Sequence, residues 1–281
     1  MNYRKTALVC GCSFTAGSYS WDPEYIQYNH VLQSDGTTVK QDNGLGRERL
    51  DINGGWVEHL DPQDHYTIYA ISGGGIAQHA TVVEHYYQTN QLADFDYIVV
   101  QCTWEPRLTW NTPGTIEDCF WYEHDLQAEN IDMYQGKGTS KHFNFLNAGN
   151  KANLGGNFNE YPDYQKKLFD GMTNTNVVQS CATLIDERCK QTDTQLFYFP
   201  WADCGPEHNL KFENGTRLQF PYPWGVGTGT MDIFLKEQYH VFGPIDPKIS
   251  RDGSDTFIGH FTREGNRIIG ERIRKELDQY L

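Results

Sequence analysis

The sequence predicts an α/β protein with three α/β/α layers, in which helices cover both faces of a doubly wound parallel sheet. Four short apolar runs are continuous rather than alternating, which is typical of strands buried on both faces. Each run ends in small or polar residues and is followed by a segment that can form a helix, and this alternation indicates a doubly wound sheet. The four runs are residues 6–10, 66–71, 97–102 and 195–199.

Three segments between and after these runs have helical patterns. In the last of them, Ile269, Ile273, Leu277 and Leu281 recur at every fourth position and form one apolar stripe. Thr262 stands just ahead of this segment, where a threonine can cap a helix. The helices are expected over about residues 76–91, 175–190 and 263–280.

Two long stretches do not follow the alternation of strand and helix. Residues 104–163 and 202–250 are rich in aromatic residues, asparagine and glycine. Loops of this length in a compact domain are either functional or contain structure that the pattern does not reveal. Since the chain has no internal repeat and no linker, we expect a single domain over residues 1–281, with these two insertions forming a substrate cap.

The composition excludes several classes of partner. The chain has 281 residues, with 23 Lys and Arg against 37 Asp and Glu, a net charge of −14. A surface so acidic repels phosphate backbones, and the basic residues near the C-terminus alternate with glutamates as on a solvated helix face. No apolar run approaches the roughly 18 residues of a membrane span. We therefore expect neither a nucleic acid nor a membrane as partner.

The seven cysteines do not indicate a disulfide framework or a zinc site. Their number is odd, the chain is too long to need disulfides, and the pair Cys10 and Cys12 has no second pair to complete a zinc knuckle. Asp252 and Asp255 lack the rest of a calcium loop. We expect reduced cysteines, no metal and no other cofactor. The apolar residues 7–10 are too short for a secretory signal, so a cytoplasmic protein is expected. The high content of asparagine, glycine and tyrosine also suits a phage-encoded protein.

We look for catalytic residues directly after the predicted strands, because ligands of open α/β sheets bind beyond the carboxyl ends of the strands. After the first strand, Ser13 lies between Gly11 and Gly17, where a serine hydroxyl can be exposed beside backbone N–H donors. The alternative is a helix cap. A phosphate-binding loop is disfavoured, because no lysine follows Gly17.

Three further segments supply partners for such a serine. Gly73, in the glycine-rich turn after the second strand, can donate its N–H to a ligand, although glycines there also suit a tight turn. Polar residues follow the third strand. His260 stands just before the last helix, with Asp252 and Asp255 upstream, which suits a base oriented by a carboxylate.

Together, the segments 11–17, 72–75 and 259–265 resemble the SGNH/GDSL hydrolase superfamily. This resemblance implies a flavodoxin-like α/β/α fold and hydrolysis of esters, often acetyl groups on sugars. It implies that Ser13 is the nucleophile and His260 the base. Cys12 stands where the family has aspartate.

The chain departs from the family pattern at three positions. The residue three before the histidine is Phe257, so the triad acid has to be Asp255 or, less favoured, Asp252. The family's oxyanion asparagine corresponds to Thr103, with Gln101 as the alternative donor. The family glycine corresponds best to Gly73, with Gly74 one residue along.

These residues predict a serine esterase that acts on an O-acyl, preferably O-acetyl, ester of a carbohydrate. Ser13 and His260 with Asp255 form the catalytic triad, and Ser13, Gly73 and Thr103 form the oxyanion hole. The aromatic side chains of the insertions suit a sugar-binding cap, or alternatively a second small core. The other hypothesis is a weak or inactive module of the same fold that binds glycans. Transfer of the acyl group to a sugar, rather than to water, uses the same residues and is a further alternative.

Overall fold

The computed structural model describes the framework of the domain. The described residues are 4–12, 15–16, 30–32, 38–40, 55–71, 74–102, 107–111, 116, 120–123, 129–136, 143–147, 171–200, 210–221, 228–229 and 263–281. Among these residues, a seven-stranded sheet has the order β11-β10-β5-β1-β4-β8-β7, in which six strands are parallel and β7 runs antiparallel to β8. This sheet and the three α-helices of the described part confirm the predicted α/β class.

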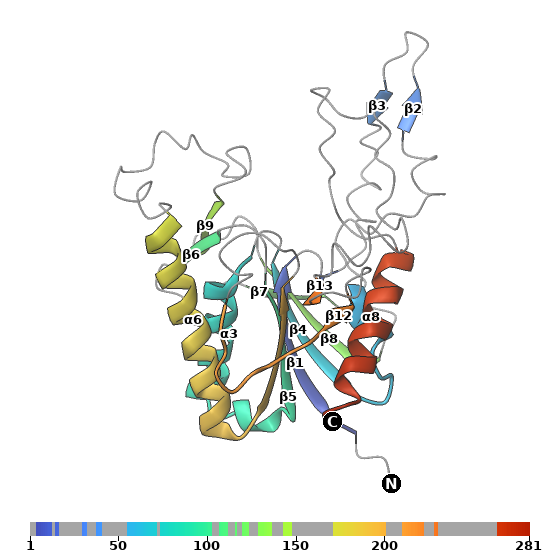
Figure 1. The fold of residues 1–281 in the computed structure, drawn as a ribbon. Helices are drawn as coiled ribbons and strands as arrows, with labels where there is room; N and C mark the ends of the chain where they lie inside the picture. Colours follow the sequence, from blue (N-terminus) through green and yellow to red (C-terminus); the bar gives the residue numbers. More distant parts are fainter. Residues whose placement is uncertain are drawn as a thin grey trace.

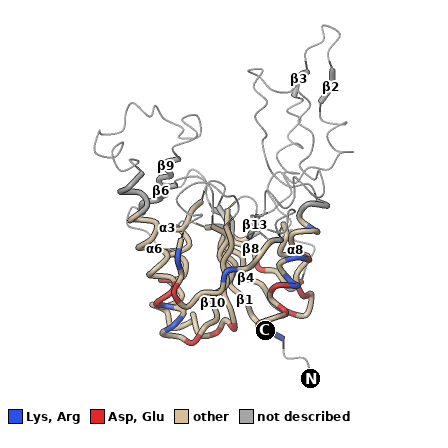
Figure 2. The backbone as a smooth tube through the Cα atoms, viewed as in Figure 1, with Lys and Arg blue, Asp and Glu red and all other residues tan. Residues whose placement is uncertain are grey.

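The four predicted strands form the centre of this sheet. They are β1 (Thr6–Cys12), β4 (His65–Ile71), β5 (Tyr97–Cys102) and β10 (Gln195–Pro200). None of the four contains Asp, Glu, Lys or Arg, and the charged residues of the described part lie mainly on the helices and connecting loops (Figure 2). Strands without charge are expected where both faces of a sheet are covered.

The three predicted helices are α3 (Ile76–Gln88), α6 (Gly171–Thr192) and α8 (Arg263–Leu277). Helices α3 and α6 lie on one face of the sheet and α8 lies on the other (Figure 1). Two 3-10 helices, η1 (Gly55–His59) and η2 (Leu92–Asp94), join the strands. Thr262, the predicted cap of α8, lies outside the described residues.

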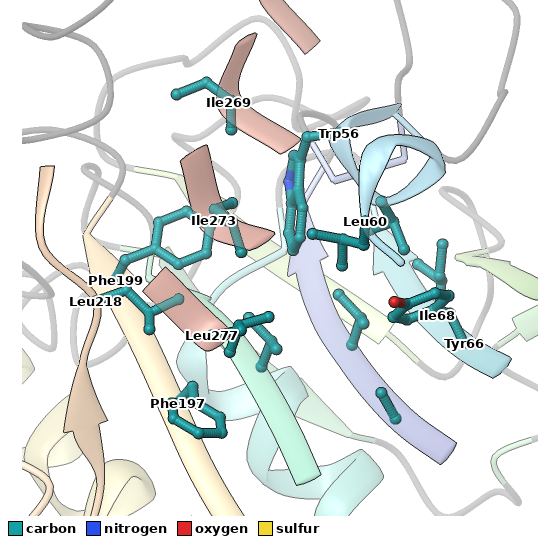
Figure 3. Close-up of a cluster of buried hydrophobic side chains, with 14 of the residues drawn as sticks. Trp56, Leu60, Tyr66, Ile68, Phe197, Phe199, Leu218, Ile269, Ile273 and Leu277 are labelled. Carbon is teal, nitrogen blue, oxygen red and sulfur yellow. The ribbon is translucent and has the colours of Figure 1, made fainter. Parts of the chain in front are cut away.

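Each face of the sheet has its own apolar core, because successive strand residues point to opposite faces. Ala7 and Val9 of β1 belong to the cluster under α8, whereas Leu8 and Cys10 belong to the cluster under α3 and α6. The apolar stripe predicted on the last helix belongs to the cluster under α8, where Ile269, Ile273 and Leu277 face the sheet (Figure 3).

Helix α8 also packs closely on η1. The buried indole of Trp56 meets the ring of Phe199 edge to face, with ring centroids 5.5 Å apart. A Cβ atom on Gly270 would overlap the Trp56 carbonyl and lie 2.6 Å from the His59 Cβ. Glycine at this position therefore lets helix and loop approach each other.

Parts of the two predicted insertions belong to the sheet and its core. Strands β7 (Phe120–Glu123) and β8 (Ile131–Gly136) come from residues 104–163 and extend the sheet beyond β4. Strand β11 (Thr216–Arg217) and the buried Leu210 and Leu218 come from residues 202–250. Strand β8 alternates buried and half-buried residues, so a search for continuous apolar runs does not find it.

Three short strand pairs complete the described elements. They are β2 (His30–Leu32) with β3 (Thr38–Lys40), β6 (Arg107–Asn111) with β9 (Phe143–Asn147), and β12 (Phe220–Pro221) with β13 (Thr228–Gly229). No helix in the described part of the chain has the length and apolar character needed to cross a membrane.

Candidate active site

The candidate site lies at the carboxyl edge of the sheet, where β1, β4 and β5 end side by side. Cys12 of β1 is in register with Ile71 of β4, and Cys10 is in register with Val100 of β5. The chain passes from β1 to β4 on one side and then crosses to β5 on the other, so the strand order reverses between β1 and β5. Open α/β sheets bind ligands at such a switch point.

The turn after β1 is closed by a hydrogen bond from the Ala16 N–H to the Cys12 carbonyl, 3.1 Å long. Gly11 leaves room for this turn, because a Cβ atom there would overlap the Thr15 side chain and lie 3.0 Å from the Gln101 Oε1. The glycine of the predicted motif is thus explained by a close approach between β1, the turn and β5.

A buried polar contact holds the turn against β5. The Thr15 hydroxyl donates to the Gln101 Oε1, and the Cys12 thiol donates to the same oxygen at 3.7 Å. Thr15 and Gln101 are fully buried. The Gln101 Nε2 is also buried and has no hydrogen-bond partner among the described residues.

The next element after β4 is α3, whose start follows the end of that strand in the chain. Gly75 caps this helix without a side-chain hydrogen bond, and its carbonyl accepts the N–H groups of Gln78 and His79 at 3.0 and 3.3 Å. Gln78 is fully buried, and its side-chain amide has no hydrogen-bond partner among the described residues. Buried side-chain amides therefore lie at the end of β5 and in the first turn of α3.

The predicted catalytic residues themselves lie outside the described residues. This holds for Ser13, Gly73 and Thr103, and also for Asp252, Asp255 and His260. The structure does bring together the strand ends that precede the first three in the chain, namely Cys12, Ile71 and Cys102. Of the alternative residues, Gly74 and Gln101 are described.

His260 lies outside the described residues, but it precedes helix α8 closely in the chain. The helix begins at Arg263, three residues after His260, and its last turn lies near Lys5 at the amino edge of the sheet. Helix α8 therefore runs opposite to the strands, and its first turn is at the carboxyl edge (Figure 1).

Sequence reasoning missed the role of Thr15. Its hydroxyl meets a residue 86 positions away in the chain, so no local spacing reveals the contact. The available signal was the position of Gln101, a polar residue in an otherwise apolar buried strand. A buried side-chain amide requires hydrogen-bond partners.

Four of the five described cysteines are buried, and Cys181 is half-buried. Cys10, Cys12, Cys102, Cys181 and Cys189 are not disulfide-bonded. Burial raises the pKa of the Cys10 thiol far above its ordinary value and raises the pKa of Cys189 to about 12. Among the described residues, no group of three or more His, Cys, Asp or Glu side chains is arranged to hold a metal ion.

A hollow of about 350 Å³ lies at the opposite, amino edge of the sheet. Lys5, Asp61, Asp64 and Arg274 border it together with Tyr97, and burial raises the pKa of the Asp64 carboxyl.

Three aromatic residues of 104–163 lie on strands β7 and β8 and contact the sheet or each other. The Tyr134 ring stacks on Tyr69 of β4 at 4.6 Å between centroids, and Phe120 meets the same ring edge to face at 4.8 Å. The Tyr122 hydroxyl donates to Asp132 at 2.6 Å. Phe120 and Tyr134 therefore pack with the apolar cluster under α3 and α6.

Comparisons with models of protein families, with curated proteins and with solved structures found no match to this chain.

Proposed function

We propose that this chain is a serine hydrolase of the SGNH type that cleaves an O-acyl ester. The observation that carries the proposal is the closed turn after β1, which lies at the switch point and contains Ser13 between Cys12 and Ala16. A nucleophilic serine has to be held rigidly beside donors for the developing oxyanion. In support, the hydrogen bond between Ala16 and Cys12 and the contact of Thr15 with β5 hold the residues on either side of Ser13.

The strand order supports the finer, flavodoxin-like assignment. Taken in chain order, β1, β4, β5, β10 and β11 are strands one to five, and they lie in the order 2-1-3-4-5. This is the order of flavodoxin-like sheets, whose ligands bind between strands one and three. In this assignment, strands β8 and β7 are additional strands at the edge of the sheet beyond β4.

In the proposed reaction, His260 removes the proton from the Ser13 hydroxyl as its oxygen attacks the ester carbonyl. The oxyanion is held by the N–H groups of Ser13 and Gly73 and by a side-chain donor after β5, Thr103 or Gln101. When the intermediate collapses, the alcohol leaves with the proton from His260. Water then attacks the acyl-enzyme by the same route, releases the acid and restores Ser13. Asp255, or Asp252 in its place, orients the imidazole and stabilises its charge.

A substrate with an acetyl group on a carbohydrate remains the preferred proposal. Its support is the aromatic and asparagine-rich composition of residues 104–163 and 202–250. Phe120, Tyr122 and Tyr134 do not contribute to this support, because they pack on the sheet or bond to it.

A glycan-binding module without turnover is the second candidate. It is favoured by one observation, namely that Thr103 and not asparagine follows Cys102 at the end of β5. Loss of one oxyanion donor lowers the rate by about 10²–10³.

The experiment is peptide mass spectrometry after treatment with a fluorophosphonate probe, in which an activated serine displaces fluoride from phosphorus. We expect the wild type to be labelled at Ser13, and Ser13→Ala and His260→Ala to remain unlabelled. Ser180→Ala is the matched control, since the Ser180 hydroxyl lies on α6 and donates to the Asn176 carbonyl of the same helix at 2.9 Å. A folded wild type that is not labelled would refute the hydrolase and favour the binding module.

A further inference from the structure

We infer that Asn214 is a site of deamidation that Asp186 holds in check, and that loss of the Asn214 amide releases strand β11 from helix α6. None of the residues involved takes part in the proposed hydrolysis, so this inference does not depend on that function. It is carried by the hydrogen bonds between Asn214 and Asp186, by the burial of Asp186 and by the glycine that follows Asn214.

The first step is the reactivity of the pair Asn214 and Gly215. An asparagine loses its side-chain amide when the backbone nitrogen of the next residue attacks the side-chain carbonyl carbon, and glycine has no Cβ atom to obstruct this attack. Packing requires glycine here, because a Cβ atom on Gly215 would lie 2.8 Å from the Phe212 Cβ and 3.2 Å from the Leu196 side chain. The fold therefore keeps a labile pair at this position.

The second step is the chemistry, which needs only water. The Gly215 nitrogen forms a bond to the Asn214 Cγ, and the side-chain nitrogen leaves as ammonia with the proton of the Gly215 N–H. Water then opens the cyclic imide to aspartate or isoaspartate. Asn214 is exposed, so water reaches it. The product has a carboxylate in place of the amide and has lost the N–H donors.

The third step is the contact that restrains this reaction. The Asn214 Nδ2 donates to the Asp186 Oδ2 at 2.7 Å, and the Asn214 backbone N–H lies 3.1 and 3.2 Å from the two carboxylate oxygens. Hydrogen bonds to a charged acceptor are about twice as strong as neutral ones. Because ring closure expels the Nδ2 group, its bond to Asp186 has to open first, and deamidation is slow while α6 holds the side chain.

The fourth step is the effect of the product. A carboxylate at position 214 repels the Asp186 carboxylate, which is 3% exposed and loses the partner that the Asn214 amide supplied. Strand β11 follows two residues later and is the edge strand of the sheet in the described part, with two residues paired to β10. So short a strand depends on the contact with α6, and the modified chain cannot restore that contact.

Other titratable groups near this contact do not change charge between about pH 4 and pH 8, apart from the exposed Glu213. Cys189 of α6 and Tyr198 of β10 both interact with Asp186. Burial raises the pKa of Cys189 to about 12 and raises the pKa of Tyr198 above its ordinary value, so both stay neutral. Repulsion between the two carboxylates is therefore the effect that acid removes.

The first test is the rate of deamidation at about pH 8, measured by peptide mass spectrometry. In urea we expect Asn214 to react as fast as Asn43 and Asn53, which also precede glycine. In the native protein the Asn214 rate should be lower by about 10–10³. Asp186→Ala should raise the native rate by about tenfold or more. If that variant does not fold, Asp186→Asn replaces it, and it should raise the rate less because it keeps an acceptor oxygen.

The second test uses Asn214→Asp as the product of the reaction. We expect its melting temperature at pH 7 to fall by about 4–8 °C and hydrogen exchange of residues 214–218 to become faster. Asn214→Ala loses the donor without adding charge, so it should be more stable than Asn214→Asp at pH 7, and the difference should shrink toward about pH 4. Asn90→Asp adds the same charge at an exposed position and should change the melting temperature by less than about 2 °C.

The double variant Asp186→Asn with Asn214→Asp reverses the pair and should recover the lost stability, because an amide again faces a carboxylate. A native Asn214 that stays intact for more than about 10³ times its half-life in urea would overturn the site itself. Equal native rates in wild type and the Asp186 variants would overturn the role of Asp186. Equal stability of Asn214→Asp and Asn214→Ala at pH 7, with unchanged exchange of residues 214–218, would overturn the release of β11.

Discussion

At the scale of single residues, Gly11 and Thr15 show how a short motif depends on a distant strand. Gly11 ends the regular alternation of β1, and the Thr15 side chain occupies the space that a Cβ atom at position 11 would take. Thr15 in turn donates to Gln101 on the neighbouring strand. The spacing of glycine and threonine around Ser13 is thus a requirement of packing at the strand end as well as of the proposed chemistry.

We predict that Gly11→Ala lowers the free energy of unfolding by about 1–3 kcal/mol, because overpacking a closed site forces neighbours to move. Urea denaturation monitored by circular dichroism measures this change. In a Thr15→Gly background the added methyl group meets neither the Thr15 hydroxyl nor the Thr15 Cβ, so the same substitution should cost less. Equal stability of Gly11→Ala and wild type would contradict the close approach between β1 and the turn.

At the scale of elements, α3 and α6 are joined by an ion pair with two hydrogen bonds. The Arg188 Nε donates to the Glu84 Oε2 at 2.6 Å, and its second guanidinium nitrogen donates to Oε1 at 3.2 Å. The guanidinium also lies over the Tyr87 ring, 4.2 Å from its centroid. The hydrogen bond from Arg188 lowers the pKa of the Glu84 carboxyl below its ordinary value of 4.5.

We predict that Glu84→Gln lowers the free energy of unfolding at pH 7 by about 0.5–1 kcal/mol, the size expected for a partly exposed pair. A carboxyl with a lowered pKa stabilises the fold above its unfolded pKa, and this contribution is lost as the pH falls through the folded value. The difference between wild type and Glu84→Gln should therefore shrink below about pH 4.5. Urea denaturation at neutral and acid pH measures it.

The exposed Glu213→Gln serves as the control for this pair, with a change within about 0.5 kcal/mol at both pH values. A pH-independent effect of Glu84→Gln would mean that the charge of Glu84 does not contribute to the contact between α3 and α6.

At the scale of the whole molecule, stability comes from two apolar clusters on opposite faces of one sheet. Cys10 and Cys189 lie in the cluster under α3 and α6, whereas Cys12 lies in the cluster under α8. Cys181 is half-buried at the edge of the cluster under α3 and α6. Buried thiols of this kind report on unfolding, because only the thiolate reacts and burial raises the pKa of Cys10 and Cys189.

We predict that iodoacetamide at pH 8 modifies Cys181 in the native protein and leaves Cys10, Cys102 and Cys189 unmodified until the protein unfolds. Peptide mass spectrometry after labelling, with and without urea, measures each site separately. Modification of Cys10 at the same rate in both conditions would show that the central strand is not covered as described.

The sequence alone was sufficient to predict the α/β class, the four central strands and the three helices, because these depend on local apolar periodicity and on turn residues. Strands β7, β8 and β11 were not predicted. The alternation of buried and half-buried residues in β8 and the two-residue length of β11 also occur in loops. Neither segment can therefore be recognised as a strand before its neighbour in the sheet is known. Their place in the sheet depends on register with distant residues.

For the candidate site, the sequence alone predicted that polar residues after β1, β4 and β5 meet at one edge, and the register of Cys12 with Ile71 agrees with this. The roles of Ser13, Gly73, Thr103, Asp255 and His260 stay predictions, since these residues lie outside the described part. Only the tertiary structure decided that Thr15 meets Gln101, because a contact between residues 86 positions apart depends on how parallel strands align and not on any local pattern.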